Sequence, residues 1–133
     1  MILIACVDER MGMMFNHRRI SQDKIVCMDI LDMCPNRVLY MEEYSYKLFQ
    51  EFDSVNVKVI DNITSIQNNE YFFAENPEAI DENLIEKIVL YRWNRKYPAD
   101  RYFPIDLGKW ILMNSEEFAG KSHEKITKEV WER

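Results

Sequence analysis

The feature that most constrains this sequence is the continuous apolar run ILIACV at residues 2–7. A short run without polar residues is typical of a central strand in a parallel sheet, because other elements cover both faces of such a strand. The rest of the chain must therefore supply two covering layers. With 133 residues, 47% of them hydrophobic, the chain is long enough to form such a core as a single domain over residues 1–133.

Strand-like and helix-like segments alternate along most of the chain. We expect strands over residues 37–41, 56–60, 71–74 and 87–93, and helices over residues 21–34 and 43–52. Two late strands, over residues 110–117 and 123–133, are joined by a turn at residues 119–121. This order predicts an α/β fold with a mostly parallel central sheet, flanking helices and an antiparallel C-terminal hairpin.

Two expected helices begin with recognisable capping residues. Ser21 precedes the apolar pattern of the first helix, so we expect it to be the N-cap. Asn76 followed by Pro77 is typical of an N-cap and a first helical position. This pair predicts a further helix that buries Ile80 and Leu84.

The charge balance argues against several classes of partner. The net charge of -6 disfavours nonspecific nucleic-acid binding, which requires clustered cations. The apolar N-terminal segment is interrupted by charges at residues 8–10 and is too short for a signal peptide or a membrane span. We therefore expect a cytoplasmic protein with no nucleic-acid or membrane partner.

The cysteines and histidines do not form a metal-binding pattern. Cys6, Cys27 and Cys34 have no CxxC spacing, and we expect them to be reduced in the core. The two histidines, His17 and His123, are far apart in the sequence, so we predict no metal site. His123 is expected on the surface of the C-terminal hairpin.

The best candidate for a ligand site is the basic segment NHRRISQD, which ends at Asp23. Arg18 and Arg19 could clamp a phosphate or carboxylate through bidentate hydrogen bonds. Asn16 and His17 could orient that ligand, and Asp23 could act as a base or as a hydrogen-bond anchor. The alternative is a solvated loop in which Asp23 only favours the helix dipole.

Five segments stand in a characteristic order: ILIACVDERMGMMFN, RVLYMEEYSYKLF, EKIVLYRW, ADRYFPIDLGKW and SHEKITKEVWER. Together they resemble dihydrofolate reductase. The last three resemble a strand of that family, its D-x-x-F-P-x-x-x-x-x-W segment and its closing strand. The resemblance spans nearly the whole chain, with one internal deletion, and implies the fold of that family.

The resemblance also implies where the family's ligands would lie. Asp23 matches the acidic residue that binds the pterin, and Tyr91 stands where the family has a threonine that shares a water with that acid. The nicotinamide of NADPH would lie near Ala5 and Cys6, with Gly12 in the covering loop.

The half of the family pattern that binds the cofactor is not matched. Ala74 and Glu75 stand near a glycine pair of the family, and Glu42 and Glu43 stand near a glycine that is followed by a cationic residue. The family's extra strand and loop after the second helix are missing. A like-charge contact at about 4 Å costs roughly 4 kcal/mol at an effective dielectric of about 20. The sequence therefore predicts that neither NADPH nor another cofactor is bound.

These observations leave several functions open. The first is a divergent reductase-fold protein that has lost NADPH-dependent reduction and binds a different small anionic or heterocyclic ligand, with or without turnover. The second is an NADPH-dependent reductase with an altered cofactor site. The third is a structural or partner-binding protein, such as a homodimer, with a vestigial pocket. Acid–base cleavage by His17, Arg18 and Asp23 is a further alternative, and spacing alone does not establish a Ser-His-Asp arrangement.

Overall fold

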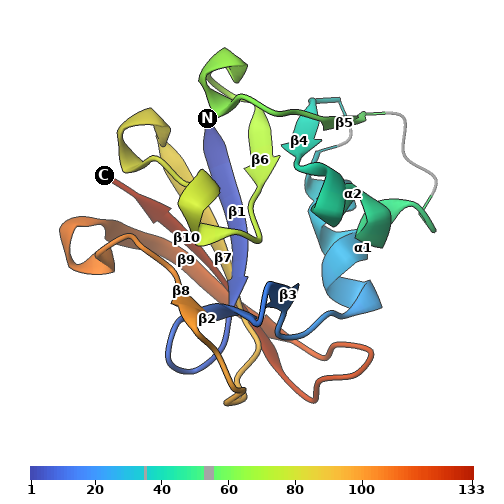
Figure 1. Ribbon diagram of the computed structural model, residues 1–133. Helices are drawn as coiled ribbons and strands as arrows, with labels where there is room; N and C mark the ends of the chain where they lie inside the picture. The colour runs from blue at the N-terminus through green and yellow to red at the C-terminus, as the bar shows by residue number, and fades with distance from the viewer. Residues whose placement is uncertain (35, 53–55) are drawn as a thin grey trace.

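The computed structural model describes residues 1–34, 36–52 and 56–133. Its main element is a seven-stranded sheet with the strand order β5-β4-β6-β1-β7-β10-β9 (Figure 1). The strands are β1 (Ile2–Val7), β4 (Leu39–Met41), β5 (Val57–Val59), β6 (Tyr71–Phe73), β7 (Lys87–Arg92), β9 (Ile111–Phe118) and β10 (Ile126–Glu132).

Strand direction in this sheet agrees with the expected fold class. The strand β1 lies in the middle and pairs in parallel with β6 and β7, and β4 pairs in parallel with β5 and β6. The last two strands, β9 and β10, pair antiparallel with each other, and β10 pairs antiparallel with β7. The predicted α/β fold with a mostly parallel sheet and an antiparallel C-terminal hairpin is confirmed.

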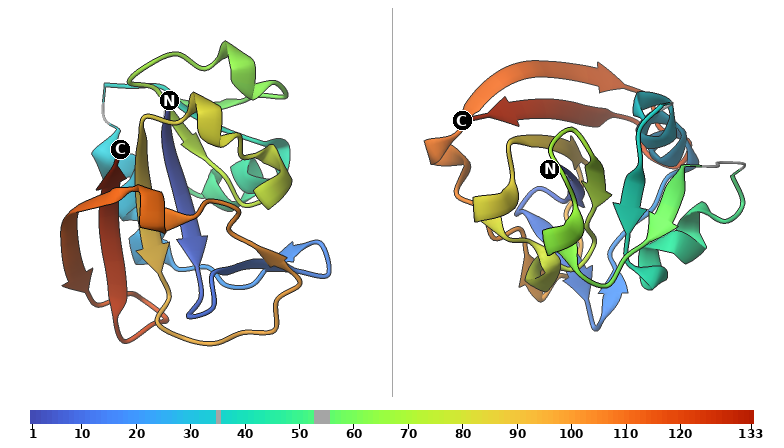
Figure 2. Two further views of the ribbon diagram at one scale, coloured as in Figure 1. Left: turned by 90° about the vertical axis from the view of Figure 1, so that its left-hand side faces the viewer. Right: turned by 90° about the horizontal axis from the view of Figure 1, so that it is seen from above.

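Both faces of β1 are buried, as its apolar sequence predicts. Ile2 and Ile4 face one core cluster, to which the helices α1 (Lys24–Met33) and α2 (Glu43–Phe49) contribute. Leu3 and Ala5 face a second cluster on the other side of the sheet. The short turns between β6 and β7 cover that second side (Figure 2). The single run at residues 2–7 therefore organises the two layers.

A second, three-stranded sheet is built from β3 (Arg18–Arg19), β2 (Gly12–Phe15) and β8 (Arg101–Tyr102). The β2–β3 hairpin turns through Asn16 and His17, whose φ angles are 52° and 63°. Two consecutive positive φ angles are typical of the primed turns that match the twist of a hairpin. Residues 16–19 of the basic segment are thus part of an ordered β-hairpin.

The predicted helix after Asn76 is wrong. The chain forms two 3-10 turns instead, η2 (Pro77–Ala79) and η3 (Glu82–Leu84). Asp81 accepts a hydrogen bond from the Asn83 N–H at 3.0 Å and so caps the second turn separately. Side chains of Asp and Asn that bond the nearby backbone compete with helix continuation, which explains the break.

Other elements differ from expectation mainly in their bounds. The helix α2 ends at Phe49, three residues earlier than predicted, and the 3-10 turn η1 (Ile63–Ser65) lies between β5 and β6. The turn η4 (Leu107–Lys109) precedes β9. None of the helices in the described ranges has the length and apolar character needed to span a membrane.

Candidate functional site

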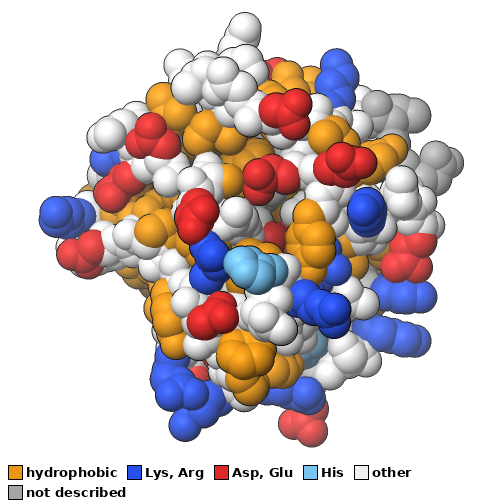
Figure 3. Space-filling model, in the orientation of Figure 1, with side chains coloured by type: hydrophobic (Ala, Val, Ile, Leu, Met, Phe, Trp, Pro, Cys, Tyr) orange, Lys and Arg blue, Asp and Glu red, His pale blue; other side chains and the backbone are white. Residues whose placement is uncertain are grey.

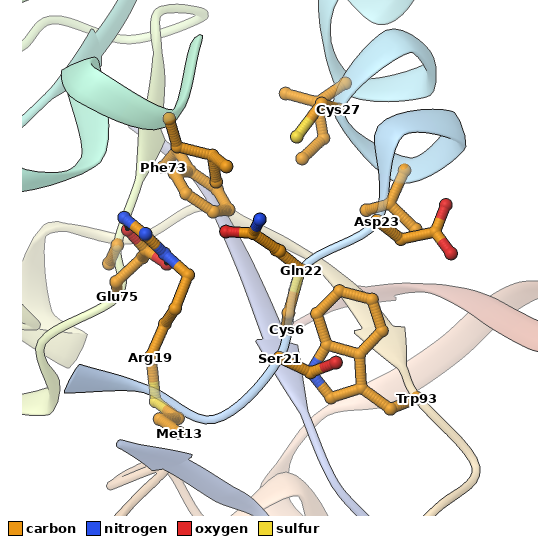
Figure 4. A pocket seen from close by; sticks show the side chains of 14 residues that line it. Cys6, Met13, Arg19, Ser21, Gln22, Asp23, Cys27, Phe73, Glu75 and Trp93 are labelled. Carbon is orange, nitrogen blue, oxygen red and sulfur yellow. Dashed lines mark hydrogen bonds and ion pairs between the residues drawn. The ribbon is translucent and has the colours of Figure 1, made fainter. Parts of the chain in front are cut away.

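A small cavity lies between the N-terminal end of α1 and the carboxyl ends of β1 and β6 (Figure 4). The residues that surround it include Cys6, Arg19, Ser21, Gln22, Asp23, Val26, Cys27, Phe73, Glu75 and Trp93. Its volume of about 20 Å³ is comparable to the space that one water molecule requires. Side chains therefore largely fill the place where the resemblance locates a pterin.

One wall of the cavity is an ion pair between Arg19 and Glu75. Arg19 Nε donates to Glu75 Oε2 at 2.7 Å, and Arg19 Nη2 donates to Glu75 Oε1 at 2.9 Å. Ser45 Oγ also donates to Glu75 Oε1, at 2.8 Å. Burial opposes the charge on Arg19, but the hydrogen bonds to Glu75 outweigh it and raise the pKa of the guanidinium.

Arg19 also joins the basic hairpin to α2 through Tyr44. The guanidinium carbon of Arg19 lies 4.4 Å from the centroid of the Tyr44 ring, and the Arg19 N–H donates to the Tyr44 hydroxyl at 3.1 Å. A cation above an aromatic face is a favourable contact. From the sequence we expected Glu75 to be an open negative charge and Arg19 to be a free cation. In the structure each neutralises the other.

A larger groove of about 620 Å³ lies beyond this pair and opens to solvent. Among the residues that the structure describes, five carboxylates line it, those of Glu42, Glu43, Asp61, Glu75 and Glu78. Figure 3 shows one face of the molecule, where several acidic side chains lie among hydrophobic and uncharged groups in the upper part.

The cations in this groove are mostly committed to partners. Arg101 forms a hydrogen-bonded ion pair with Glu78, and Arg19 pairs with Glu75 at the inner wall. His17 lines the groove and is exposed. Burial raises the pKa of Glu42, and the nearby carboxylates of Asp61 and Glu75 raise it further. The groove is thus an acidic environment at neutral pH.

Asp23 is the most heavily hydrogen-bonded carboxylate among the described residues, and only 3% of it is exposed. As N-cap of α1 it accepts from the Ile25 N–H at 2.9 Å. It also accepts from the N–H groups of Lys121 and Ser122 at 2.9 Å and from the Ser122 hydroxyl at 3.2 Å. His123 Nδ1 lies 2.8 Å from Asp23 Oδ2.

These donors keep Asp23 ionised. Burial alone would raise its pKa, but the hydrogen bonds from Lys121, His123, Ser122 and Ile25 hold the pKa well below its usual range. Figure 4 shows the carboxylate directed away from Gln22 and the cavity. Asp23, rather than the predicted Ser21, is the N-cap of α1.

Gly120 allows the C-terminal hairpin to approach this carboxylate. A Cβ atom at Gly120 would lie 2.5 Å from Asp23 Oδ2, which is closer than real Cβ contacts permit. Without a side chain at this position, the N–H groups of Lys121 and Ser122 reach the carboxylate oxygens. A segment 98 residues away in the sequence thus completes the cap of α1.

His123 is buried, so its predicted surface position is wrong. Its Nε2 atom lies 2.9 Å from Ser21 Oγ and 3.0 Å from the Tyr97 hydroxyl. Its ring stacks on Trp93, with 4.6 Å between centroids and 22° between planes. Sequence reasoning missed this cluster, although Gly120 in the turn beside His123 was a signal of a close backbone approach.

Tyr91 is fully buried and contacts a different acid from the one that the resemblance implied. Its hydroxyl donates to Asp29 Oδ2 at 2.5 Å, and Lys128 Nζ lies 2.9 Å from the same oxygen. Burial, followed by the hydrogen bond to Asp29, raises the pKa of the Tyr91 hydroxyl. A ligand-binding role for Tyr91 stays a prediction.

The other predicted ligand-binding residues are separated from one another. Arg19 and Asp23 line the small cavity, and His17 lines the acidic groove. Asn16 and Arg18 are exposed at the hairpin turn, where the Asn16 N–H donates to Asp100 Oδ2 at 3.0 Å. The basic segment is thus divided between the small cavity and the acidic groove. A single anion clamp formed by Arg18 and Arg19 stays a prediction.

A further exposed feature lies on the edge strand β9. Ile111, Leu112 and Met113 are 58%, 45% and 57% exposed. The homodimer that we considered from the sequence stays a prediction.

Comparison with known proteins reveals similarity at the level of structure. No family model and no curated protein matches the sequence. Among solved structures, a dihydrofolate reductase from Enterococcus faecalis, complexed with NADP(H) and RAB-propyl, superposes with a TM-score of 0.72 at 10% sequence identity. The superposition covers 100% of this chain and 96% of that chain. A likeness at this identity concerns the fold, and it agrees with the resemblance of the five sequence segments.

Proposed function

Because the chain has the dihydrofolate reductase fold, we propose that it binds a small ligand in the acidic groove and that this ligand is not NADPH. The carboxylates of Glu42, Glu43 and Asp61 favour a heterocycle that carries positive charge or several hydrogen-bond donors. The proposal keeps the heterocyclic ligand expected from the sequence and replaces the anionic alternative.

The single observation that carries this proposal is the group of three carboxylates, Glu42, Glu43 and Asp61, that line the groove besides Glu75 and Glu78, which pair with arginines. The family's cofactor would bring its pyrophosphate to the region of Glu42 and Glu43. One like-charge contact at about 4 Å costs roughly 4 kcal/mol at an effective dielectric of about 20, or nearly a thousandfold in affinity. Two such contacts leave little net affinity for a dinucleotide.

The arginines do not reverse this balance. Arg19 is held by Glu75 through two hydrogen bonds, and Arg101 is held by Glu78. To bind a phosphate, Arg19 would have to release Glu75, which is only 9% exposed and would lose its charged partner. Leaving a buried charge unpaired is strongly unfavourable. An anionic ligand therefore meets a cost that a cationic ligand avoids.

Thermal unfolding with three probes tests the proposal. We expect 2,4-diaminopyrimidine, an amidine-like heterocycle, to raise the melting temperature, and NADPH and glucose 6-phosphate to leave it unchanged. A ligand present at 100 times its dissociation constant stabilises the folded state by about 2.7 kcal/mol, which such a measurement resolves. The double variant Glu42→Gln and Glu43→Gln should bind the heterocycle about tenfold more weakly.

Two results would overturn the proposal. The first is a micromolar dissociation constant for NADPH, which would favour the reductase alternative. The second is equal affinity of the wild type and the double variant for the heterocycle, since the groove carboxylates would then contribute nothing.

A further inference from the structure

Ser21, His123 and Asp23 form a continuous hydrogen-bonded chain at the small cavity, separate from the acidic groove. Ser21 Oγ lies 2.9 Å from His123 Nε2, and His123 Nδ1 lies 2.8 Å from Asp23 Oδ2. We propose that this chain is a catalytic triad in which Ser21 is the nucleophile for hydrolysis of small acyl esters. The arrangement has the order of contacts that activates a serine by an oriented base.

The carboxylate determines which nitrogen of His123 can accept a proton. Asp23 Oδ2 also accepts from the N–H and hydroxyl groups of Ser122, so it acts as an acceptor toward every partner around it. The proton of neutral His123 therefore resides on Nδ1, facing Asp23, and Nε2 is left with a lone pair toward Ser21. Stacking of the ring on Trp93 holds this orientation.

Tyr97 supplies a second hydroxyl at the same nitrogen. The Tyr97 oxygen lies 3.0 Å from His123 Nε2, and Ser21 Oγ donates to the same Tyr97 oxygen at 3.2 Å. A proton that leaves Ser21 thus reaches His123 directly or through Tyr97. In either arrangement Ser21 loses the proton and His123 gains it.

The cavity limits the acyl group that can be bound. Ser21 is half-buried and lines a space of about 20 Å³ whose walls include Val26 and Phe73. This volume accommodates one or two heavy atoms, which is enough for the methyl group of an acetyl ester but not for a long acyl chain. The apolar walls suit the methyl group of an acetyl ester.

The cysteines in the same cavity do not compete as nucleophiles. Burial raises the pKa of the Cys27 thiol to about 12, and burial also raises the pKa of Cys6. Both thiols are therefore protonated at neutral pH, and the thiolate is the reactive form of cysteine. Ser21, which has an adjacent base, is the better nucleophile.

The positive features near Ser21 are largely offset by carboxylates. Ser21 precedes the N-terminal end of α1, a ten-residue helix whose dipole is positive at that end, but the Asp23 carboxylate caps this end. Arg19 lines the cavity as well, and Glu75 neutralises its charge. Oriented donors for the developing oxyanion contribute about a hundredfold or more in efficient enzymes, and because this site has only these offset fields in their place we expect slow turnover.

The reaction proceeds in two steps with water as the second reactant. Ser21 Oγ attacks the ester carbonyl carbon while its proton passes to His123 Nε2. The bond from carbon to the leaving oxygen then breaks, His123 returns the proton to that oxygen, and the alcohol departs. Water next attacks the acyl-serine with His123 as base, which releases the carboxylic acid and restores the Ser21 hydroxyl.

Hydrolysis of p-nitrophenyl acetate by the full chain tests the proposal. We expect release of p-nitrophenol to fall at least tenfold in Ser21→Ala and in His123→Asn, whose amide can still donate to Asp23. Ser65→Ala serves as the matched control, because Ser65 is exposed and its hydroxyl donates to the Asn62 carbonyl in η1. This control should retain the wild-type rate.

Labelling with methanesulfonyl fluoride, a serine reagent whose reactive group carries only a methyl, provides a readout that a structural role would not change. Peptide mass spectrometry should place the methylsulfonyl group on Ser21 in the wild type and find none in His123→Asn, provided that circular dichroism shows a folded variant. Labelling of Tyr97 instead of Ser21 would overturn the assignment. Wild-type turnover no faster than that of Ser21→Ala would overturn it as well.

Discussion

Glu75 and Asp23 are two buried carboxylates on either side of the same small cavity, and they are stabilised in different ways. Glu75, 9% exposed, is paired with the guanidinium of Arg19 and receives one neutral hydrogen bond from Ser45. Asp23, 3% exposed, receives backbone N–H groups, the Ser122 hydroxyl and the ring of His123.

The difference determines what each carboxylate does to its surroundings. The field of Glu75 is cancelled by a full positive charge, so the pair acts as a neutral wall between the cavity and the acidic groove. The charge of Asp23 is solvated by dipoles that have no net charge, and it therefore still orients and polarises His123. Glu75 therefore forms part of a neutral wall, whereas Asp23 orients the base of the triad that we propose.

Replacing Asp23 should have the largest effect on stability. In Asp23→Asn the amide would place N–H groups against the N–H donors of Lys121 and Ser122, which would leave buried polar groups unsatisfied. We expect a loss of about 3 kcal/mol in the free energy of unfolding, measured by urea denaturation. Asp81→Asn is the matched control, because Asp81 caps the exposed turn η3 and asparagine caps equally well. Equal losses in the two variants would contradict this account of Asp23.

Breaking the Arg19–Glu75 pair should have an intermediate effect. Arg19→Met leaves Glu75 buried with Ser45 as its remaining donor, and we expect a loss of about 2 kcal/mol at pH 7, moderated by the partial exposure of Arg19. Adding Glu75→Gln should recover part of this loss. A double-mutant cycle measures the coupling between the two side chains. Coupling near zero would show that the two charges are independently solvated.

The pH dependence of unfolding should show a smaller effect that is specific to Asp23. The folded-state pKa of Asp23 lies well below that of the unfolded chain, which is about 3.9, so its contribution is fully present above that value and is lost as the pH falls toward the folded pKa. Between pH 4 and pH 3 the wild type should lose about 1 kcal/mol more than Asp23→Asn. Urea titrations at these two pH values give the difference, and parallel losses would contradict the assignment.

Patterns within single segments were sufficient to predict most of the fold. The apolar run at residues 2–7 became the central strand β1, and the order of strands and helices predicted the mostly parallel sheet. The segment after Asn76 was predicted wrongly, because Asp81 caps a second turn in place of a continuous helix. Local side-chain competition of this kind is difficult to weigh from a sequence.

The candidate site was predicted less completely than the fold. Asp23 was identified from its position at a helix start, but its partners Lys121, Ser122 and His123 lie about a hundred residues away. The acidity at Glu75 was also identified, yet its neutralisation by Arg19 depends on a contact across 56 residues.

The sequence by itself determined the α/β architecture, the excess of negative charge and the acidic residues at positions 42, 43 and 75. Hydrophobic periodicity and net charge are properties of the chain that do not depend on how its segments pack together. Only the tertiary structure decided which charges neutralise one another and that Ser21, His123 and Asp23 meet. Hydrogen bonds and ion pairs depend on distances of a few ångströms, and the folded chain sets those distances between segments that its sequence keeps far apart.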